Sequence, residues 1–426
     1  MSPNGERVIY ARQDGPNEAN AYFVGTDLKG GPQTKISAPS DPRKMRDFVW
    51  MPDGRMIYGL NERVEAGSKV LTCNLWQVHL DARTSEIIDK PQRLTNFAEL
   101  CVNPVGATSD GKQLGVFEWR PHSSVYVSEL QAGGEHASTP VRLTREESWN
   151  HPLAWTADSK TILFSSSRTG TDVIFKQVLG QDTAEPLLAL AKSEGLVGAC
   201  LSPDGSWVYY TTSSYDEGPM VSSKIMRDPV TDVLPMAMSK IMQVPITGGA
   251  PQLVLTANIE EWPRCARTPA SLCAIAERTP DRKQLVFTAL DPVKGRGREL
   301  ARSNVEATTG YHWDLSPDGT RIALLKHRDG KVQILSLNGG AIRSIVSKEG
   351  TTLSSVVWTA DGKGLFVSSY TGRGADMLHM DFQGSTRLLW EQPGGIEIYG
   401  VPSPDGQHLA MRGWNVEGNI WMMENF

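Results

Sequence analysis

Two histidines and two acidic residues are the side chains in this sequence best suited to hold a metal ion. His151, His312, Glu261 and Asp314 each lie at the start of a short stretch that reads as a strand. Imidazole nitrogens and carboxylate oxygens together form a mixed site for a divalent metal, which can activate water to hydrolyse an ester, lactone or phosphotriester. No HExxH or paired CxxC spacing accompanies them. The competing interpretation is two separate histidines bonded to backbone, with no cofactor.

A wider set of polar and aromatic residues occupies the same kind of position, at the start of a short apolar run. If these runs are the innermost strands around one axis, their starts converge at one mouth whatever their separation in sequence. Converging charges could shift pKa values and bind a polar ligand. In the alternative, each side chain solvates a loop or bonds to the neighbouring sheet. The candidate ligand-binding residues are Arg46, Asp47, Glu99, Trp149, Asn150, His151, Glu261, Arg264, Tyr311, His312, Asp314 and Tyr399.

The five cysteines include one pair whose spacing suits a disulfide. Cys265 and Cys273 flank the tetrapeptide Thr268–Ser271, and an antiparallel hairpin around this turn places them opposite each other. A bond there would suit an oxidising compartment. The alternative is two buried thiols on adjacent strands, because cysteine packs well as a small apolar residue. No cysteine lies in a recognisable nucleophile context.

A repeated tetrapeptide indicates the strands and turns that must position these residues. The pattern Ser/Thr-Pro/Ala-Asp-Gly recurs about every 45 residues, with two longer spacings. Proline sets the first corner, the aspartate accepts a backbone hydrogen bond two residues on, and glycine takes a positive φ. The copies begin at Ser2, Met51, Thr108, Thr156, Ser202, Ser316, Thr359 and Ser403, with a degenerate copy at Thr268.

The flanks of these turns are rich in β-branched and aromatic residues, which predicts strands. Leu153–Trp155 and Val356–Trp358 precede turns, and Thr161–Ser165 and Trp207–Thr211 follow them. Each unit therefore reads as strand, turn, strand, loop, strand, turn, strand. No helical period persists for three turns. Repeated four-stranded antiparallel sheets of this length predict an all-β protein, a β-propeller in which the flat faces of the blades supply the core.

The sequence indicates the number of blades less directly than it indicates the fold. Complete units begin near residues 45, 99, 150, 196, 261, 311 and 354, and both ends of the chain are incomplete. We expect one propeller domain over residues 1–426 with eight blades, within a range of seven to nine. Residues 1–37 and 397–426 are then incomplete terminal blades that share closure. Alternatively, the chain is a piece of a longer protein.

Composition excludes several classes of function for this chain. The formal net charge is −5, from 43 basic and 48 acidic residues, whereas a nucleic-acid or anionic-membrane surface needs a basic footprint. No apolar run is long enough for a membrane-spanning helix, and the first 20 residues lack the apolar core of an export signal. We therefore expect no nucleic acid as a partner and no membrane insertion by this chain.

The Ser-Pro-Asp-Gly turns resemble the propeller repeats of TolB and its relatives, and Ser165–Phe175 is similar to another stretch of that repeat. Trp119–Tyr126 and Asp291–Glu299 resemble propellers appended to membrane-anchored bacterial regulators or kinases. The resemblance implies an extracytoplasmic, periplasmic location and a sensor or interaction role. Related propellers gate peptidases, but this sequence has no Gly-x-Ser-x-Gly elbow.

Two functional hypotheses follow, and whether the protein is an enzyme stays open between them. The first is a sensor or interaction propeller that binds a peptide, a glycan, a small molecule or another protein. The alternative is a metal-assisted hydrolase of the esterase, lactonase or phosphotriesterase type in the central channel, with His151, Glu261, His312 and Asp314 as ligands or catalytic groups. This alternative rests on analogy between propellers.

Overall fold

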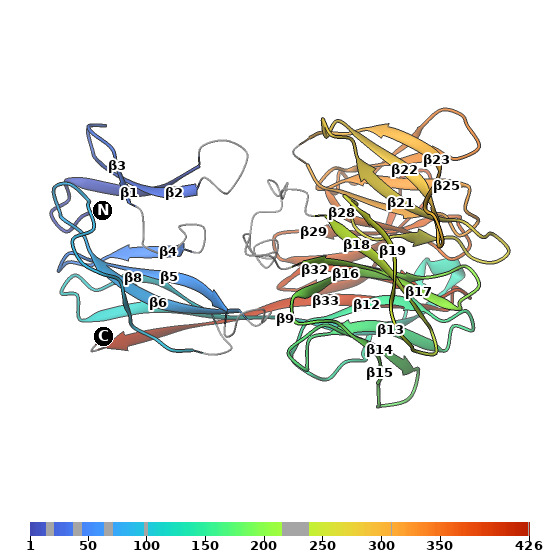
Figure 1. Ribbon diagram of the computed structural model, residues 1–426, viewed down its shortest axis with the longest axis horizontal. Coiled ribbons are helices and arrows are strands. Elements are labelled where there is room, and N and C mark those ends of the chain that lie inside the picture. The colour runs from blue at the N-terminus through green and yellow to red at the C-terminus, as the bar shows by residue number, and fades with distance from the viewer. Residues whose placement is uncertain are drawn as a thin grey trace. The chain divides into compact units, whose positions relative to one another are not determined.

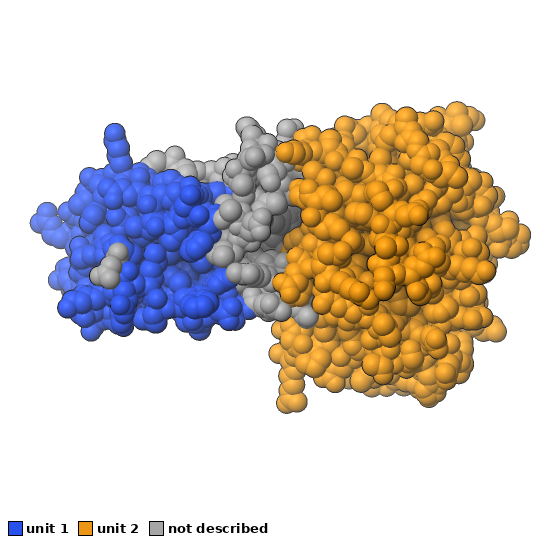
Figure 2. Space-filling view, turned by 90° about the horizontal axis from the view of Figure 1, so that it is seen from below, with its two compact units in different colours: residues 1–120, 217–223, 417–426 blue, residues 121–216, 224–416 orange. Residues whose placement is uncertain are grey.

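The computed structural model describes residues 1–13, 21–36, 45–63, 71–97, 101–214, 238–307, 309–424 and 426. The chain divides into two compact units (Figures 1 and 2). The described residues of unit 1 lie within 1–120 and 417–426, and those of unit 2 lie within 121–214 and 238–416. Both are built of β-strands, and the described residues include one short 3-10 turn, η3 (Ala132–Gly134).

Local hydrogen bonds explain why the repeated tetrapeptide ends one strand and starts the next. After β16 (Glu194–Leu201), the hydroxyl of Ser202 donates to the carboxylate of Asp204. The backbone N–H of Ser206 donates to the same carboxylate over 3.1 Å. Gly205 has a φ of +72°, which a side chain would strain. The turn thus forms from its own residues, as the sequence predicts.

One copy of this turn escaped the sequence pattern. Thr279–Arg282 joins β21 (Cys273–Arg278) to β22 (Gln284–Asp291). The Thr279 hydroxyl donates to Asp281 over 2.6 Å, as in the other copies. Arginine stands where glycine is usual, with a φ of +62°. This copy lies between the second and third strands of its sheet, whereas the copy at Ser202 follows the first strand of its sheet.

Unit 1 contains three groups of paired strands. Its described strands are β1 (Arg7–Gln13), β2 (Ala21–Asp27) and β3 (Thr34–Ile36) in one sheet; β4 (Met45–Trp50), β5 (Arg55–Arg63), β6 (Leu71–His79) and β7 (Gln92–Arg93) in the next; and β8 (Cys101–Ala107) with the first part of β9 (Gln113–Gln131) and the last part of β33 (His408–Glu424). Trp50 and Tyr58 are buried in a cluster that also includes Ile9 and Ile36.

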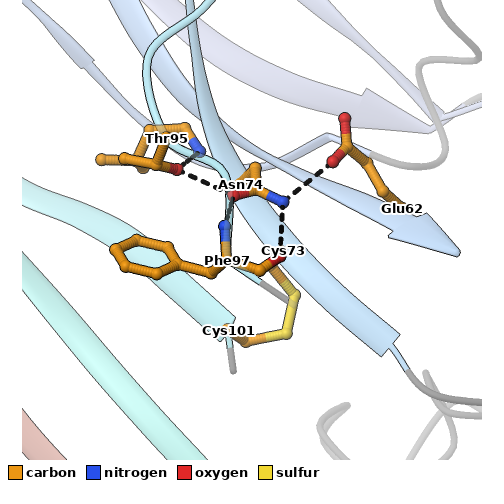
Figure 3. Close-up of a disulfide and its surroundings, with 7 residues drawn as sticks. Glu62, Cys73, Asn74, Thr95, Phe97 and Cys101 are labelled. Carbon is orange, nitrogen blue, oxygen red and sulfur yellow. Dashed lines mark hydrogen bonds between the residues drawn. A yellow bond between two sulfur atoms is a disulfide. The ribbon is translucent and has the colours of Figure 1, made fainter. Parts of the chain in front are cut away.

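A disulfide joins two neighbouring strands of unit 1 (Figure 3). Cys73 of β6 is bonded to Cys101 of β8, at the position where these two strands pair in parallel. Beside it, the amide of Asn74 donates to Glu62 over 2.9 Å and accepts from the hydroxyl of Thr95 over 3.0 Å. Covalent and polar links therefore hold the outer part of β6 to both neighbours.

The described residues of unit 2 form five four-stranded antiparallel sheets, each from four consecutive strands. The strands are β12 (Asn150–Trp155), β13 (Thr161–Ser166), β14 (Val173–Val178) and β15 (Glu185–Ala189); β16, β17 (Trp207–Ser214), β18 (Ser239–Pro245) and β19 (Gln252–Ala257); β20 (Arg264–Cys265), β21, β22 and β23 (Gly295–Asn304); β24 (Tyr311–Leu315), β25 (Arg321–Lys326), β26 (Lys331–Ser336) and β27 (Arg343–Val346); and β28 (Leu353–Trp358), β29 (Leu365–Tyr370), β30 (Gly374–Met380) and β31 (Thr386–Pro393).

A sixth sheet of unit 2 combines segments from opposite ends of the chain. It runs from β32 (Gly395–Pro402) to β33 and then to the later part of β9, against which β10 (His136–Ala137) and β11 (Val141–Arg142) pair. The first strands of the six sheets, β12, β16, β20, β24, β28 and β32, contact one another in a closed cycle. Unit 2 is therefore a ring of sheets around an axis, which is the arrangement of a β-propeller.

The all-β propeller fold predicted from the repeat is confirmed, whereas the expected number of eight blades is not. Six sheets form the ring of unit 2, and the remaining sheets belong to unit 1. The residues expected to share a terminal blade have other partners: β33 pairs with β9, and β1 to β3 form a sheet of their own. A single domain over residues 1–426 stays a prediction.

The contacts between sheets of unit 2 are apolar. Trp358 is 1% exposed and packs in a cluster with Ala323 and Leu325 of the preceding sheet. Trp313 is fully buried against Phe287, with ring centroids 5.3 Å apart. Large aromatic side chains at strand ends thus fill the wedges between blades, because a flat sheet alone leaves these faces exposed.

Candidate functional site

A cavity of about 310 Å³ runs along the axis of unit 2. All six first strands contribute to its wall. The wall is mainly apolar, although Arg264, Arg267 and Asp314 also line it. One lining residue from each strand, in chain order, is Ala154, Cys200, Cys265, Leu315, Val357 and Tyr399.

Arg264 is a buried cation at this cavity and is 5% exposed. It donates to Glu261 over 2.9 Å and to the carbonyl oxygen of Trp313 over 3.0 Å. Its guanidinium lies 3.9 Å from the ring centroid of Trp262, which adds a cation–π contact. Burial opposes its charge, but the neighbouring Tyr399 and the acidic groups outweigh burial and raise the pKa of Arg264.

Glu261 joins Arg264 to a partly buried histidine. Its other carboxylate oxygen lies 2.5 Å from Nδ1 of His312. Burial lowers the pKa of His312, but the charge and hydrogen bond of Glu261 outweigh burial, so the pKa is raised overall. Glu261 has a φ of +64°, a conformation that costs a residue with a side chain about 1 kcal/mol or more. The backbone is therefore held in a strained form where the carboxylate meets both cations.

His151 stands apart from that pair. Its ring stacks on Tyr399 with centroids 5.1 Å apart and meets Trp262 edge-on at 6.1 Å. Neither ring nitrogen has a hydrogen-bond partner among the described residues. Burial, and then the charges of Arg412 and Arg264, lower the pKa of His151 well below its usual range. The neutral ring therefore retains one donor and one acceptor for a ligand or water.

Asp314 lies between the cavity and the neighbouring blade. One carboxylate oxygen accepts the backbone N–H of Trp358 over 2.9 Å, and the other is 3.6 Å from Arg264. Burial raises the pKa of Asp314 to about 6, although Arg264 and the hydrogen bond from Trp358 oppose the rise. The carboxyl group therefore changes charge near neutral pH.

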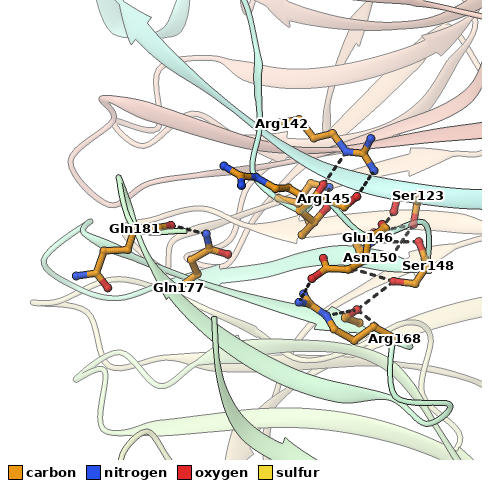
Figure 4. A network of polar contacts seen from close by, with 12 residues as sticks. Ser123, Arg142, Arg145, Glu146, Ser148, Asn150, Arg168, Gln177 and Gln181 are labelled. Atoms are coloured by element: carbon orange, nitrogen blue, oxygen red, sulfur yellow. Dashed lines mark hydrogen bonds and ion pairs between the residues drawn. The ribbon is translucent and has the colours of Figure 1, made fainter. Parts of the chain in front are cut away.

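Three other candidates take part in contacts within and between blades. Trp149 meets Trp414 edge-on, with centroids 5.4 Å apart. Asn150 is fully buried, and its amide donates to the carbonyl oxygens of Ser123, Ser148 and Glu146 over 2.8, 3.1 and 3.3 Å (Figure 4). The bond to Ser123 joins β12 to the neighbouring sheet, which contains β9, β32 and β33.

Tyr311 likewise contacts its own sheet and loop. Its hydroxyl accepts the backbone N–H of Glu306 over 3.0 Å, and its ring lies under the guanidinium of Arg278 at 5.7 Å. Tyr311 and Asn150 therefore bond to a loop or to the neighbouring sheet, which is the alternative to ligand binding.

Two of the remaining candidates lie in unit 1. Arg46 and Asp47 belong to β4 of unit 1, and Asp47 is exposed. Glu99 lies outside the described residues. Of the sequence-derived set, the residues whose contacts gather around Arg264 are therefore His151, Glu261, His312, Asp314 and Tyr399.

The described residues contain no group of three or more histidine, cysteine, aspartate or glutamate side chains that could hold a metal ion. Of the four residues expected as ligands, Glu261 and His312 contact each other, whereas His151 is bounded by aromatic rings. The metal site and its hydrolase chemistry stay predictions.

Several residues at the site were missed by the sequence pattern. Trp262 and His327 lie in loops, and the ring of His327 is 5.8 Å from that of His312. Burial, then the charge of His312, lower the pKa of His327 to about 4. Arg267 lines the other end of the cavity, beside the Thr268 turn. Arg267 follows a first strand, and this position is a pattern in the sequence that could have indicated it.

Comparison with solved structures finds propellers. A protein described as TolB from Agrobacterium tumefaciens is 16% identical, with a TM-score of 0.46 over 69% of this chain and 98% of that one. TolB from Acinetobacter baumannii is 14% identical, with a TM-score of 0.41 over 86% and 82%. A chain of a nidogen/laminin complex is 11% identical, with a TM-score of 0.44 over 69% and 98%. The ring of sheets in unit 2 itself is the propeller that the TolB-like turns predict.

No protein-family model matches this sequence, and no curated protein is significantly similar to it. Among the residues that the structure describes, no helix has the length and apolarity to cross a bilayer.

Proposed function

We propose that this chain is a binding propeller that receives a small ligand, or the end of a peptide or glycan, in the axial cavity of unit 2. The observation that carries the proposal is the cavity itself. It is about 310 Å³ in volume, its wall is mainly apolar, and its polar groups include the buried Arg264 and Tyr399 and the partly buried Arg267 and Asp314. Specific small-molecule sites share this combination.

One further contact supports a ligand at this place. Tyr399 lines the cavity, and its ring stacks on His151, whose buried ring nitrogens have no partner among the described residues. Buried polar groups are usually satisfied, and each one left without a partner costs about 1–3 kcal/mol. A ligand with hydroxyl or carbonyl groups would offset that cost.

Removing one hydroxyl tests the proposal without disturbing the fold. We expect Tyr399→Phe to keep the stacking on His151 and to weaken binding of those fragments that bind the native protein in a ligand-observed NMR screen. Tyr370→Phe is the matched control, because Tyr370 is 44% exposed and outside the cavity. A screen that yields no fragment sensitive to Tyr399→Phe would refute the proposal.

We further propose an extracytoplasmic location, supported by the disulfides Cys73–Cys101 and Cys265–Cys273. A maleimide gel-shift on protein trapped with acid from cells tests it. We expect one alkylated thiol when the native chain is in its own compartment, and five after reduction. Five alkylated thiols before reduction would argue against an oxidising compartment.

A further inference from the structure

Arg267 carries a charge that no acidic side chain among the described residues neutralises by contact. Its guanidinium lines the axial cavity and donates only to backbone carbonyl oxygens, those of Pro402 and Pro404 at 3.2 Å and of Ala360 at 3.4 Å. No ion pair joins it to a described residue. Asp314 and Asp405 act on it only through space, and burial outweighs both, lowering its pKa. An enclosed cation without a contacting anion is costly.

The acidic groups of the cavity are already engaged. Glu261 contacts both Arg264 and His312. Asp314 accepts the backbone N–H of Trp358 and lies 3.6 Å from Arg264. At Arg267, therefore, about one positive charge is left for a ligand to balance, and a monoanion meets this need without leaving excess negative charge.

The wall around Arg267 offers apolar surface and few other donors. The indole N–H of Trp155 already donates to the carbonyl oxygen of Val401 over 2.9 Å, and that of Trp358 to the carbonyl oxygen of Asp314 over 3.2 Å. Both rings border the cavity, together with aliphatic side chains such as Val357. The matching ligand has an apolar body and one charged end.

We propose that the cavity binds a monocarboxylate, with the carboxylate on the guanidinium of Arg267 and an aliphatic or aromatic body along the wall. This inference rests on the proposed binding function and names its ligand class. The planar fork of a guanidinium fits a carboxylate through two parallel hydrogen bonds. The carboxylate belongs to a small free acid or to the C-terminus of a peptide.

Acids and their uncharged amides separate this proposal from general apolar binding. We would titrate the native protein by calorimetry with 4-phenylbutyrate and with 4-phenylbutyramide, and likewise with acetyl-Gly-Leu as the free acid and as the amide. We expect each acid to bind about tenfold or more tightly than its amide, since one charge-assisted pair is lost. The relative affinity of the two acids distinguishes a small acid from a peptide end. Equal binding of acid and amide would overturn the proposal.

Variants of Arg267 locate the effect. Arg267→Gln should weaken binding of the acids about tenfold or more and leave the amides nearly unchanged. Arg267→Lys keeps the charge and should restore part of the affinity. Arg343→Gln is the matched control, because Arg343 is exposed and likewise donates to a carbonyl oxygen, that of Phe382 at 2.7 Å. If Arg267→Gln does not fold, the lysine variant and the comparison of acids with amides still test whether the cavity binds a carboxylate.

Two outcomes separate this inference from the binding function beneath it. If inorganic phosphate competes more strongly than the acids, or acids do not bind while Tyr399-dependent neutral fragments do, the carboxylate class is wrong and the binding site stands. If no compound depends on Tyr399 or Arg267, both fail.

Discussion

The sulfur of Cys200 lies 3.4 Å from the sulfur of Cys265, which is itself bonded to Cys273. Cys200 belongs to β16 and Cys265 to β20, so a free thiol of one blade faces the disulfide of the next. Cys200 is the one free cysteine of the chain. Both sulfurs border the axial cavity.

Cys200 should be unreactive in the native protein, because burial raises its pKa to about 12 and a thiol attacks as the thiolate. We expect Ellman's reagent at pH 8 to detect far less than one thiol per native chain, and one after unfolding without reductant. Peptide mapping should find Cys73–Cys101 and Cys265–Cys273. A linkage between Cys200 and Cys265 would contradict this pairing.

The ionisation of Asp314 should make the folded state less stable as pH rises. Its pKa is about 6 when folded and near 3.8 when unfolded, so between these values the folded state binds the proton more tightly. Stability therefore falls from pH 4 to pH 6, by an amount on the order of 2–3 kcal/mol. Well below pH 3.8 both states are protonated, so the stability contributed by this group is complete and no longer changes with pH.

Asp314→Asn removes this dependence while retaining an oxygen for the backbone N–H of Trp358. We expect the free energy of unfolding of the native protein, relative to this variant, to decrease from pH 4 to pH 7 in urea titrations. Asp182→Asn is the control, because Asp182 is 78% exposed, and its difference from native protein should stay nearly flat. Equal slopes for the two variants would refute the assignment.

The pKa of one histidine of the site should lie above the usual value of 6.5, and the pKa values of two others should lie below it. NMR should find the pKa of His312 above 6.5, that of His327 near 4 and that of His151 well below 6.5. Because Glu261 raises the pKa of His312 against burial, Glu261→Gln should lower it. His→Gln variants assign the resonances. A pKa of His312 that does not respond to Glu261→Gln would show that another group holds its proton.

The strained backbone of Glu261 predicts an unusual order of stability. Glu261→Ala and Glu261→Gly both remove the carboxylate from Arg264 and His312, but only alanine retains the cost of a positive φ. We expect the glycine variant to be more stable by about 1 kcal/mol, the reverse of the usual preference. Chemical denaturation measures the difference. A more stable alanine variant would indicate that the loop relaxes to another conformation.

The strands and turns were predictable from the sequence because their causes are local. Ser202 and Asp204 hold their turn with hydrogen bonds to residues within five positions, and the alternation of β-branched and aromatic residues marks the neighbouring strands. The copy at Thr279–Arg282 was missed, and it lies between the second and third strands of its sheet, where the repeat pattern did not place a copy.

The site was predictable only in part. Strand entrances gave His151, Glu261, Arg264, His312 and Asp314, but not which of them meet. That Glu261 contacts His312 while His151 contacts Tyr399 depends on loop geometry between different blades. Arg267 reaches carbonyl oxygens about 93 to 137 residues away in the sequence, and no local pattern encodes such reach.

The sequence by itself determined the all-β character, the repeating unit and the candidates at strand entrances, because each follows from the chemistry of neighbouring residues. Only the tertiary structure decided that the later part of β9 completes a sheet with β33, that six first strands form a closed cycle, and which charged groups share a cavity. Closure of a ring is set by packing between sheets distant in sequence, where many apolar pairings have similar energies and the repeat alone does not choose among them.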